Sequence, residues 1–281
     1  MREIDVSEVT KAVRDLCISA NIYLGDDLKQ SLKSARESEE SPLGREILDV
    51  IIDNYRIAEE KQMPTCQDTG VAVVFLEIGQ DVHLVGGDLD EAVNEGVRQG
   101  YKEGYLRKSM VSDPVFDRKN TGDNTPAVVH TRIVPGENIR VLVAPKGGGS
   151  ENMSEIRMLT AAHGIEGIKN FVIERVREAG ANPCPPIVVG VGIGGCFEKA
   201  ALLAKESLMR PLGQPSEDPR FAAVEKELVE KCNDLGIGPA GFGGRTTVLA
   251  VHIKTFPCHI ASMPVAVNIQ CHACRHGEKK I

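Results

Sequence analysis

The stretch VVGVGIGGCFEKAALLAKESL, residues 188–208, is the feature that most restricts the fold of this chain. Its first part is apolar and rich in valine, which predicts a short buried strand. The glycines that follow predict a tight turn, and Ala200, Ala201, Ala204 and Leu208 recur with the period of one helix face. A strand, a turn and a helix in direct succession indicate an architecture that contains both α and β elements.

The glycines of this stretch also have the spacing of a dinucleotide-binding fingerprint. Gly190, Gly192 and Gly195 fit G-x-G-x-x-G. Such a site also needs an acidic residue about twenty positions further on, at the end of a second strand, to bind the ribose hydroxyls. That distance leads to Glu206, which lies inside the predicted helix. Nicotinamide binding is therefore not supported, and two interpretations remain open: a helix N-terminus that favours an anion, or a tight turn without a ligand.

The rest of the chain alternates helical and extended patterns. Residues 5–61 are predicted to be helical, with Asp5 or Ser7 as the first cap, and strands are predicted from Val71. The further predicted elements are a helix from about Asp88, two strands joined by a turn at Pro135 and Gly136, helices around 164–179 and 218–235, and two strands in the C-terminal third. Because the elements do not follow an even βαβ rhythm, we expect a mixed α/β (α+β) fold with helices around small mixed β-sheets.

Composition excludes several classes of protein. The 281 residues contain no linker-like or repetitive segment, so we expect one large domain over 1–281 or two closely packed lobes. Hydrophobic residues make up 42% and aromatics only 4%, which predicts an aliphatic core. The net charge of −7 argues against nucleic acid, and no apolar window is long enough to span a membrane. We expect a cytoplasmic protein whose C-terminus, CRHGEKKI, is a solvated tail.

Eight cysteines are informative in a reducing compartment, where they serve as core residues, catalytic thiols or metal ligands. Cys271 and Cys274 form the one C-x-x-C pair, and histidines lie nearby. A closed zinc site normally needs a second such pair or a pair with histidines. A non-catalytic zinc or redox scaffold therefore stays open as an alternative of a different class.

Three polar segments carry candidate site residues. The loop PTCQDTG combines a thiol, an amide and a carboxylate at a predicted helix-to-strand junction, which favours a functional site. In APKGGGSENMS, Lys146 precedes three glycines, which suits either a nest for a carboxylate or a flexible hairpin end. Arg107 is of the type that binds carboxylates through two hydrogen bonds, although most surface arginines bind nothing.

Taken together, PTCQDTG, KGGGSENMS, NPCPPIVVGVGIGG and HIASMPVAVNIQCHACR, in this order, resemble one known family. They are similar to the catalytic N-terminal half of class I, oxygen-sensitive iron–sulfur fumarate hydratases and the related L(+)-tartrate dehydratases. The resemblance extends from about residue 10 to the end of the chain. It implies a fold like the N-terminal domain of the class I fumarases.

The resemblance implies a [4Fe–4S] cluster held by Cys66, Cys184 and Cys271. Cys196 and Cys274 do not match family ligands and are not counted. Three thiolates for four irons leave one iron with an open position, which can act as a Lewis acid on a substrate hydroxyl and carboxylate. This implies an enzyme that loses activity and iron in air.

Roles for the remaining motif residues follow from the same resemblance. Asp68 and His259 are expected to handle the proton on the departing or arriving hydroxyl. The helix N-terminus after Gly195 is expected to offset the negative charge of the cluster. The implied substrate-binding set is Gln67, Arg107, Gly148 and Gly149.

The resemblance also implies a partner. Single-chain family members continue into a second domain, whereas this sequence stops at Ile281, soon after the third cysteine motif. It therefore resembles the α subunit of the two-subunit form, and we expect a β subunit together with a hetero-oligomer or a homodimer of α subunits. The expected activity is the hydration of fumarate to L-malate, a small dicarboxylate reaction, with L(+)-tartrate dehydration as the alternative.

Overall fold

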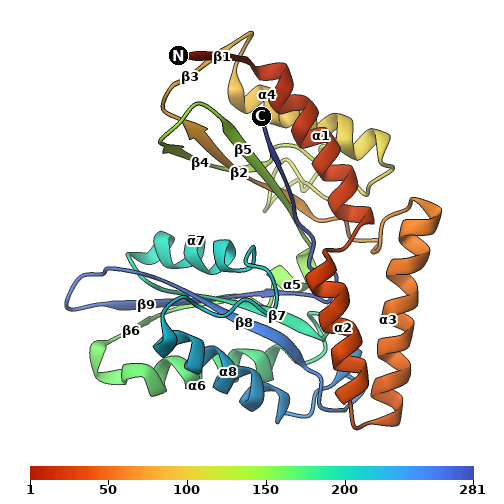
Figure 1. Cartoon of the computed structure of the whole chain (residues 1–281), viewed down its shortest axis with the longest axis vertical. Helices are drawn as coiled ribbons and strands as arrows, with labels where there is room; N and C mark the ends of the chain where they lie inside the picture. The colour runs from red at the N-terminus through yellow and green to blue at the C-terminus, as the bar shows by residue number, and fades with distance from the viewer. The chain divides into compact units, whose positions relative to one another are not determined.

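The computed structural model describes residues 1–281, which form a mixed α/β fold of two compact units (Figure 1). Unit 1 comprises Met1–Gly25, Tyr55–Gly148 and Arg275–Ile281, and unit 2 comprises Asp26–Asn54 and Gly149–Cys274. The predicted α/β class is confirmed. Each unit contains a four-stranded sheet with its own helices.

Unit 1 is built on a mixed sheet with the strand order β10-β5-β2-β4. Its elements are β1 (Arg2–Asp5), α1 (Val6–Ile22), β2 (Val71–Gly79), β3 (Val82–Val85), α4 (Leu89–Glu103), β4 (Val128–Val134), β5 (Ile139–Lys146) and β10 (Gly277–Lys280). The two strands predicted around Pro135 are present, but they do not pair with each other. Instead β2 lies between them, parallel to β4 and antiparallel to β5.

Helices α1 and α4 pack against each other, and α1 packs on β5. Both helices begin at an aspartate whose side chain accepts a backbone N–H: Asp5 from Ser7 at 2.9 Å and Asp88 from Glu91 at 2.9 Å. Such caps satisfy N–H groups that have no partner within the helix. The core between these helices and the sheet is almost entirely aliphatic, as the composition predicts, with Tyr101 as its buried aromatic residue.

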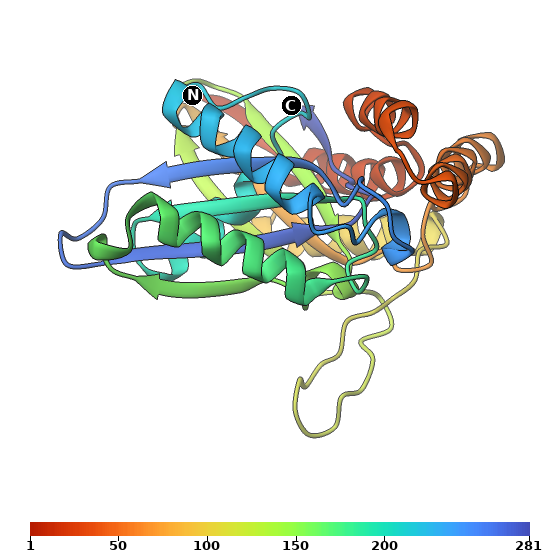
Figure 2. The same ribbon diagram turned by 90° about the horizontal axis from the view of Figure 1, so that it is seen from below.

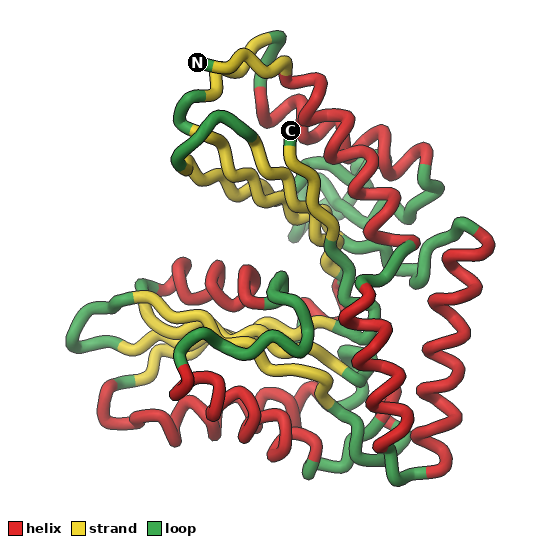
Figure 3. Tube along the Cα trace, viewed as in Figure 1, coloured by secondary structure: helices red, strands yellow, loops and turns green.

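Unit 2 contains a sheet with the order β6-β9-β7-β8, in which only β7 and β8 are parallel. Its elements are α2 (Asp26–Ser38), most of α3 (Pro42–Lys61), α5 (Gly148–Glu151), β6 (Glu155–Leu159), α6 (Gly164–Ala179), β7 (Ile187–Gly194), α7 (Phe197–Ser207), α8 (Pro219–Asn233), β8 (Val248–Phe256) and β9 (Met263–Gln270), with short 3₁₀ turns at Ala161–His163 and Pro239–Gly241. Helix α7 covers one face of the sheet, and α6 and α8 cover the other (Figures 1 and 3).

The glycines of the 188–208 stretch allow α7 to approach β7 closely. A Cβ on Gly190 would lie 2.2 Å from the Ala204 carbonyl oxygen, and one on Gly192 would lie 2.0 Å from the Ala200 carbonyl oxygen. Neither distance is compatible with a side chain. These glycines therefore serve helix-to-strand packing, which accounts for the fingerprint spacing without a nucleotide.

The C-terminal segment is not a solvated tail. Gly277–Lys280 forms β10, which pairs antiparallel with β5, and Arg275 is only 1% exposed. The prediction was wrong because an edge strand needs only its backbone to pair, so its side chains can stay charged and exposed. None of the helices combines the length and apolar character needed to cross a bilayer.

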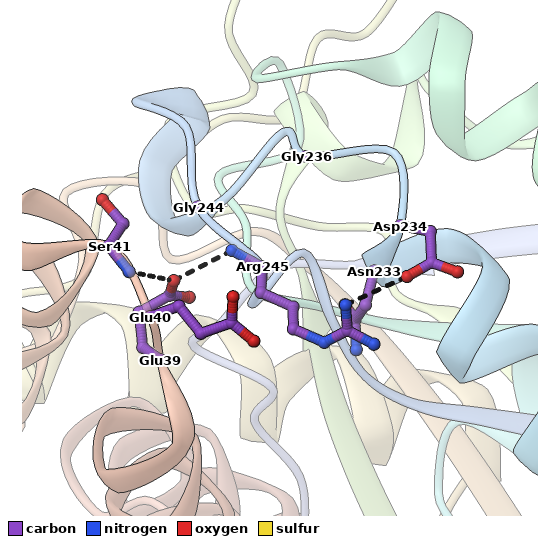
Figure 4. A pocket seen from close by; sticks show the side chains of 8 residues that line it. All are labelled: Glu39, Glu40, Ser41, Asn233, Asp234, Gly236, Gly244 and Arg245. Carbon is purple, nitrogen blue, oxygen red and sulfur yellow. Dashed lines mark hydrogen bonds and ion pairs between the residues drawn. The ribbon is translucent and has the colours of Figure 1, made fainter.

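A buried carboxylate joins α2 and α3 to the start of β8. Glu39 is fully buried, and its oxygens accept the backbone N–H groups of Ser41 (3.0 Å), Arg245 (2.9 Å) and Thr246 (2.6 Å). Burial alone would raise the pKa of Glu39, but these hydrogen bonds outweigh it and lower the pKa to about 2. Figure 4 shows this carboxylate in the wall of a pocket of about 500 Å³, which Arg245 and Asp234 also line.

His252 on β8 is another buried titratable group of unit 2. The side chain is 3% exposed, and its Nδ1 lies 3.1 Å from the Ser207 carbonyl oxygen. Burial, followed by the charge of Arg210, lowers its pKa to about 4, although Glu225 acts in the opposite direction. The ring is therefore neutral at pH 7.

Replacing Glu39 with Gln should lower the free energy of unfolding at neutral pH by about 3 kcal/mol, because the amide NH₂ would face N–H donors and the charge-assisted bonds would be lost. The stabilisation exists above the unfolded-state pKa and is lost as the pH falls from about 4.5 towards 2. Urea unfolding followed by far-UV circular dichroism measures the change. The exposed neighbour, changed as Glu40→Gln, should shift the unfolding free energy by less than about 0.5 kcal/mol; equal effects of the two changes would contradict this role for Glu39.

His252 should make the chain less stable in mild acid. Its pKa in the folded state lies below the ordinary 6.5, so stability is complete above about pH 6.5 and falls as the pH drops towards 4, by about 3 kcal/mol in all. The pH dependence of the urea midpoint tests this. His252→Gln should flatten the profile between pH 6.5 and 4, whereas the exposed-site control His83→Gln should leave it unchanged. An unaltered slope in His252→Gln would refute the assignment.

Candidate functional site

The loop between α3 and β2 presents Cys66, Gln67 and Asp68 and is held at its start by the end of α1. The Asn21 carbonyl accepts two hydrogen bonds from Thr65, from the backbone N–H at 2.9 Å and from the hydroxyl at 3.1 Å. Cys66 is half-buried and Gln67 is exposed, and the Cys66 thiol donates to the Gln67 side-chain oxygen at 3.5 Å. A thiol, an amide and a carboxylate thus lie on one anchored turn.

Asp68 is oriented by two backbone donors. Its Oδ1 accepts the Gly70 N–H at 3.0 Å, and its Oδ2 accepts the Gly148 N–H at 2.8 Å. The Asp68 N–H itself donates to the Cys66 sulfur at 3.4 Å. Each carboxylate oxygen keeps a second lone pair that can accept a further proton or hydrogen bond. The carboxylate therefore has a fixed direction and free acceptor capacity.

The end of the loop is fixed by close packing and by buried side chains. Gly70 has φ +75°, and a Cβ there would lie 2.6 Å from the backbone of Lys146 at the end of β5, so only glycine fits. The Tyr101 hydroxyl lies 2.8 Å from the Thr69 carbonyl oxygen and 2.9 Å from that of Gly70. These contacts leave the turn little freedom to change conformation.

Arg107 is joined to the same turn through its backbone. The Thr69 hydroxyl donates to the Arg107 carbonyl at 3.0 Å, and the Arg107 side chain is exposed. Arg107 lies near the start of the long loop between α4 and β4, seen in yellow-green in Figure 2. Asn124 closes the base of this loop, because its side chain accepts the Ser109 N–H and donates to the Gly70 carbonyl. Arg107 thus starts from a fixed point beside Asp68.

Unit 2 brings Cys184 and Cys271 to one end of its sheet. Cys184 precedes β7 and Cys271 follows β9, and these strands are antiparallel. The two segments are connected, since the Cys184 carbonyl accepts the His272 N–H at 3.4 Å. The α5 turn lies at the same end, where the Ser150 hydroxyl donates to the Gln270 side chain at 3.3 Å and Gly149 faces the Asn182 carbonyl.

His259 lies at the opposite end of this sheet. It belongs to the exposed loop between β8 and β9, and its Nδ1 accepts the Ala261 N–H at 3.1 Å. Strand β7 alone, with eight residues, separates the two ends by roughly 23 Å. Helix α7 begins just after this far end of β7. Its N-terminus therefore does not lie beside Cys184 and Cys271, where it was expected to offset the charge of a cluster. Within unit 2, the structure therefore does not bring His259 together with these two cysteines.

All eight cysteines are thiols, and Cys66, Cys184 and Cys271 are partly or fully accessible, whereas Cys17, Cys232 and Cys274 are buried. No three His, Cys, Asp or Glu side chains form a group that could hold a metal ion. The cluster ligand set and the zinc alternative therefore both stay predictions. The pockets beside Glu39 and beside α2 are lined by none of the predicted site residues.

Sequence reasoning missed two buried residues that support the Cys66 loop. Arg275 donates from Nη1 to the Asn21 side-chain oxygen at 3.0 Å and from Nη2 to the Asp68 carbonyl at 2.8 Å. Asn21 in turn donates from its amide to the Cys17 carbonyl at 2.8 Å. The one available signal was a polar residue, Asn21, within the apolar stripe of α1.

Comparison with known proteins places these features in one family. The model of the fumarate hydratase (fumerase) family matches residues 10–280. A protein of Methanocaldococcus jannaschii named "Putative L(+)-tartrate dehydratase subunit alpha" is 44% identical over 278 residues, 98% of each chain. The L(+)-tartrate dehydratase subunit alpha of Escherichia coli is 32% identical over 280 residues, 98% of this chain and 91% of the relative. The chain therefore belongs to the fumarate hydratase (fumerase) family.

Proposed function

We propose that this chain is the α subunit of an iron–sulfur hydro-lyase that eliminates water from a hydroxylated four-carbon dicarboxylate, with L(+)-tartrate as the first substrate to test. Two relatives that match nearly the whole chain carry the name of an L(+)-tartrate dehydratase α subunit, at 44% and 32% identity. Reversible hydration of fumarate to L-malate is the second candidate, supported by the family model. In the dehydration direction, both reactions remove a hydroxyl from one carbon and a proton from its neighbour.

The observation that carries the proposal is the hydrogen-bonded turn at Thr65–Gly70. It holds a thiol, an amide and a carboxylate within three consecutive residues, and the Thr69 hydroxyl fixes the start of the Arg107 segment beside them. Elimination from a dicarboxylate needs a group that handles a proton and a cation that binds a carboxylate. This turn supplies the proton-handling carboxylate and fixes the backbone of Arg107, which supplies the cation.

In this proposal Asp68 manages the proton on the hydroxyl. Its two oxygens are oriented by the N–H groups of Gly70 and Gly148, so its remaining lone pairs have a set direction. The exposed guanidinium of Arg107 binds a substrate carboxylate, and Gln67 and the backbone of Gly149 add polar contacts. Gly148 contributes by holding Asp68, since its N–H is already bonded there.

We further propose that Cys66, Cys184 and Cys271 hold a [4Fe–4S] cluster. Their thiols are accessible, which suits ligands, and the segments of Cys184 and Cys271 are hydrogen-bonded within unit 2. When bound, such a cluster would supply an open iron that acts as a Lewis acid on the substrate hydroxyl.

A β subunit completes the proposed enzyme. The relatives are named as α subunits, and the residues proposed here bind one carboxylate and handle the hydroxyl but include no evident base for the carbon-bound proton. We therefore expect the base and further cationic residues on β. An α chain purified alone with an intact cluster should then turn over negligible substrate.

Kinetics of the anaerobically assembled αβ enzyme test the proposed function. L(+)-tartrate, L-malate and fumarate are compared by kcat/KM under the same conditions. We expect L(+)-tartrate to be preferred by at least about tenfold, a difference of about 1.4 kcal/mol in transition-state binding. Preference for malate and fumarate would select the second candidate, and no turnover of any of the three would refute the hydro-lyase.

Changing Cys66, Cys184 or Cys271 singly to Ser should abolish stable cluster binding, because serine replaces a soft thiolate by a poor iron ligand. The wild-type α chain, reconstituted without oxygen, should contain about four irons and matching acid-labile sulfide. Iron and sulfide analysis measures the loss. Cys258→Ser, which changes another exposed thiol of this chain, should retain the iron; stoichiometric zinc with no iron in the wild type would favour the zinc scaffold.

Asp68→Asn should lower kcat of the assembled enzyme by about 10²- to 10⁴-fold, because the amide cannot accept a proton. Its iron content should stay near that of the wild type.

His259→Gln tests the proposed proton role of His259 in the same assay. A loss of similar size would support that role, whereas an unchanged kcat would remove His259 from the site, in keeping with its position at the far end of the sheet.

A further inference from the structure

Arg275 carries a buried positive charge whose hydrogen-bond acceptors are both uncharged. Its side chain is the largest of the fully buried side chains, and the residue is only 1% exposed. The acceptors are the side-chain oxygen of Asn21 and the backbone carbonyl of Asp68, and Nε is buried without a hydrogen-bond partner. A guanidinium stays charged in proteins, so this site contains a full charge away from water.

Such an arrangement is costly for stability alone. Removing an ion from water is unfavourable, and two bonds to neutral acceptors offset only part of that cost. The cost is reduced when an anion lies nearby. Arg275 and the Asp68 carboxylate flank Gly147, where a Cβ would lie 3.7 Å from the Arg275 Nη2 and 3.2 Å from the Asp68 Oδ2. The charge is therefore close to the face of the loop that we propose to bind ligands.

The two bonds of Arg275 also support both ends of the short segment that contains Cys66. One end is held through Asn21, whose carbonyl accepts both hydrogen bonds of Thr65. The other end is held directly at the Asp68 carbonyl. Cys66 and Gln67 lie between these points. A single forked side chain thus sets the span of the turn, which a point donor such as an ammonium cannot do.

We propose that Arg275 is the positioning residue of the Thr65–Gly70 turn and that its charge balances an anionic group bound there. The fork fixes the turn that presents the Cys66 thiol and the Asp68 carboxylate. Because both hydrogen bonds of Arg275 go to uncharged acceptors, its charge also favours a negatively charged occupant, and naming that occupant as the thiolate-held cluster rests on the proposed function. The positioning role does not depend on it.

Amide hydrogen exchange of the cluster-free α chain tests the positioning role. Arg275→Gln should speed exchange at the backbone amides of residues 65–70 by about tenfold or more, while the strands of unit 2 stay unchanged. Arg275→Lys should also speed it, because it loses the fork, and it provides the readout if the Gln variant does not fold. The matched control Arg140→Gln, an exposed arginine of the same unit, should leave the turn unchanged. Wild-type exchange in both Arg275 variants would overturn the positioning role.

The reduction potential of the reconstituted cluster tests the charge. Loss of a nearby positive charge disfavours the added electron, so Arg275→Gln should have a lower potential than the wild type, and Arg275→Lys should stay close to the wild type. Equal potentials in all three would overturn the charge role. A wild-type chain that takes up no iron would overturn the proposed function instead, and the exchange result would still stand.

Discussion

The candidate site depends on the hydrogen bonds that hold the Thr65–Gly70 turn against its own unit. The end of α1 holds Thr65, Arg275 holds the carbonyl of Asp68, and the Tyr101 hydroxyl contacts the carbonyls that follow. The Asn21 residue that accepts from Thr65, the Arg275 side chain and Tyr101 are buried, where a missing partner would cost more than a bond contributes at the surface. The half-buried thiol and carboxylate of the turn thereby receive fixed positions. Rigid support of this kind suits a site whose chemistry depends on orientation.

The two sheets differ in how the order and direction of their strands place the loop segments. In unit 1, β2 enters between β4 and β5, which places the start of β2, and hence the turn before it, beside the end of β5. In unit 2, β7 and β9 run antiparallel, so the segments before β7 and after β9 meet at one end. Each unit therefore brings together its own motif segments, and the chain passes from one unit to the other between Gly148 and Gly149.

Much of this fold can be predicted from local patterns. The α6 helix, the β7–α7 pair and the caps at Asp5 and Asp88 follow from periodicity and from the chemistry of helix ends. Strand order cannot be predicted in this way, because β2 separates β4 from β5 through contacts distant in sequence. Neither the edge strand β10 nor the burial of Arg275 could be predicted from the polar C-terminal segment. A charged residue that is exposed and one that is buried cannot be distinguished by sequence alone.

The candidate site was predictable in part for the same reason. The residues of the Cys66 turn are consecutive, so their proximity follows from the sequence, and the resemblance supplied their roles. The position of His259 depends on the direction of β8 and β9, which local patterns do not reveal. The glycines of the 188–208 stretch had two interpretations with the same spacing, a nucleotide turn and close packing, and only the approach of Ala200 and Ala204 distinguishes them.

The central claim is that Cys66, on its fixed turn, helps to hold an iron cluster with one iron open to substrate. The most direct test is the Mössbauer spectrum of the ⁵⁷Fe-loaded αβ enzyme, recorded without oxygen before and after addition of L(+)-tartrate. The account predicts that about one quarter of the iron signal changes on addition, as expected for one open iron among four. A spectrum that does not change with L(+)-tartrate, L-malate or fumarate, or that shows four equivalent irons throughout, would contradict it.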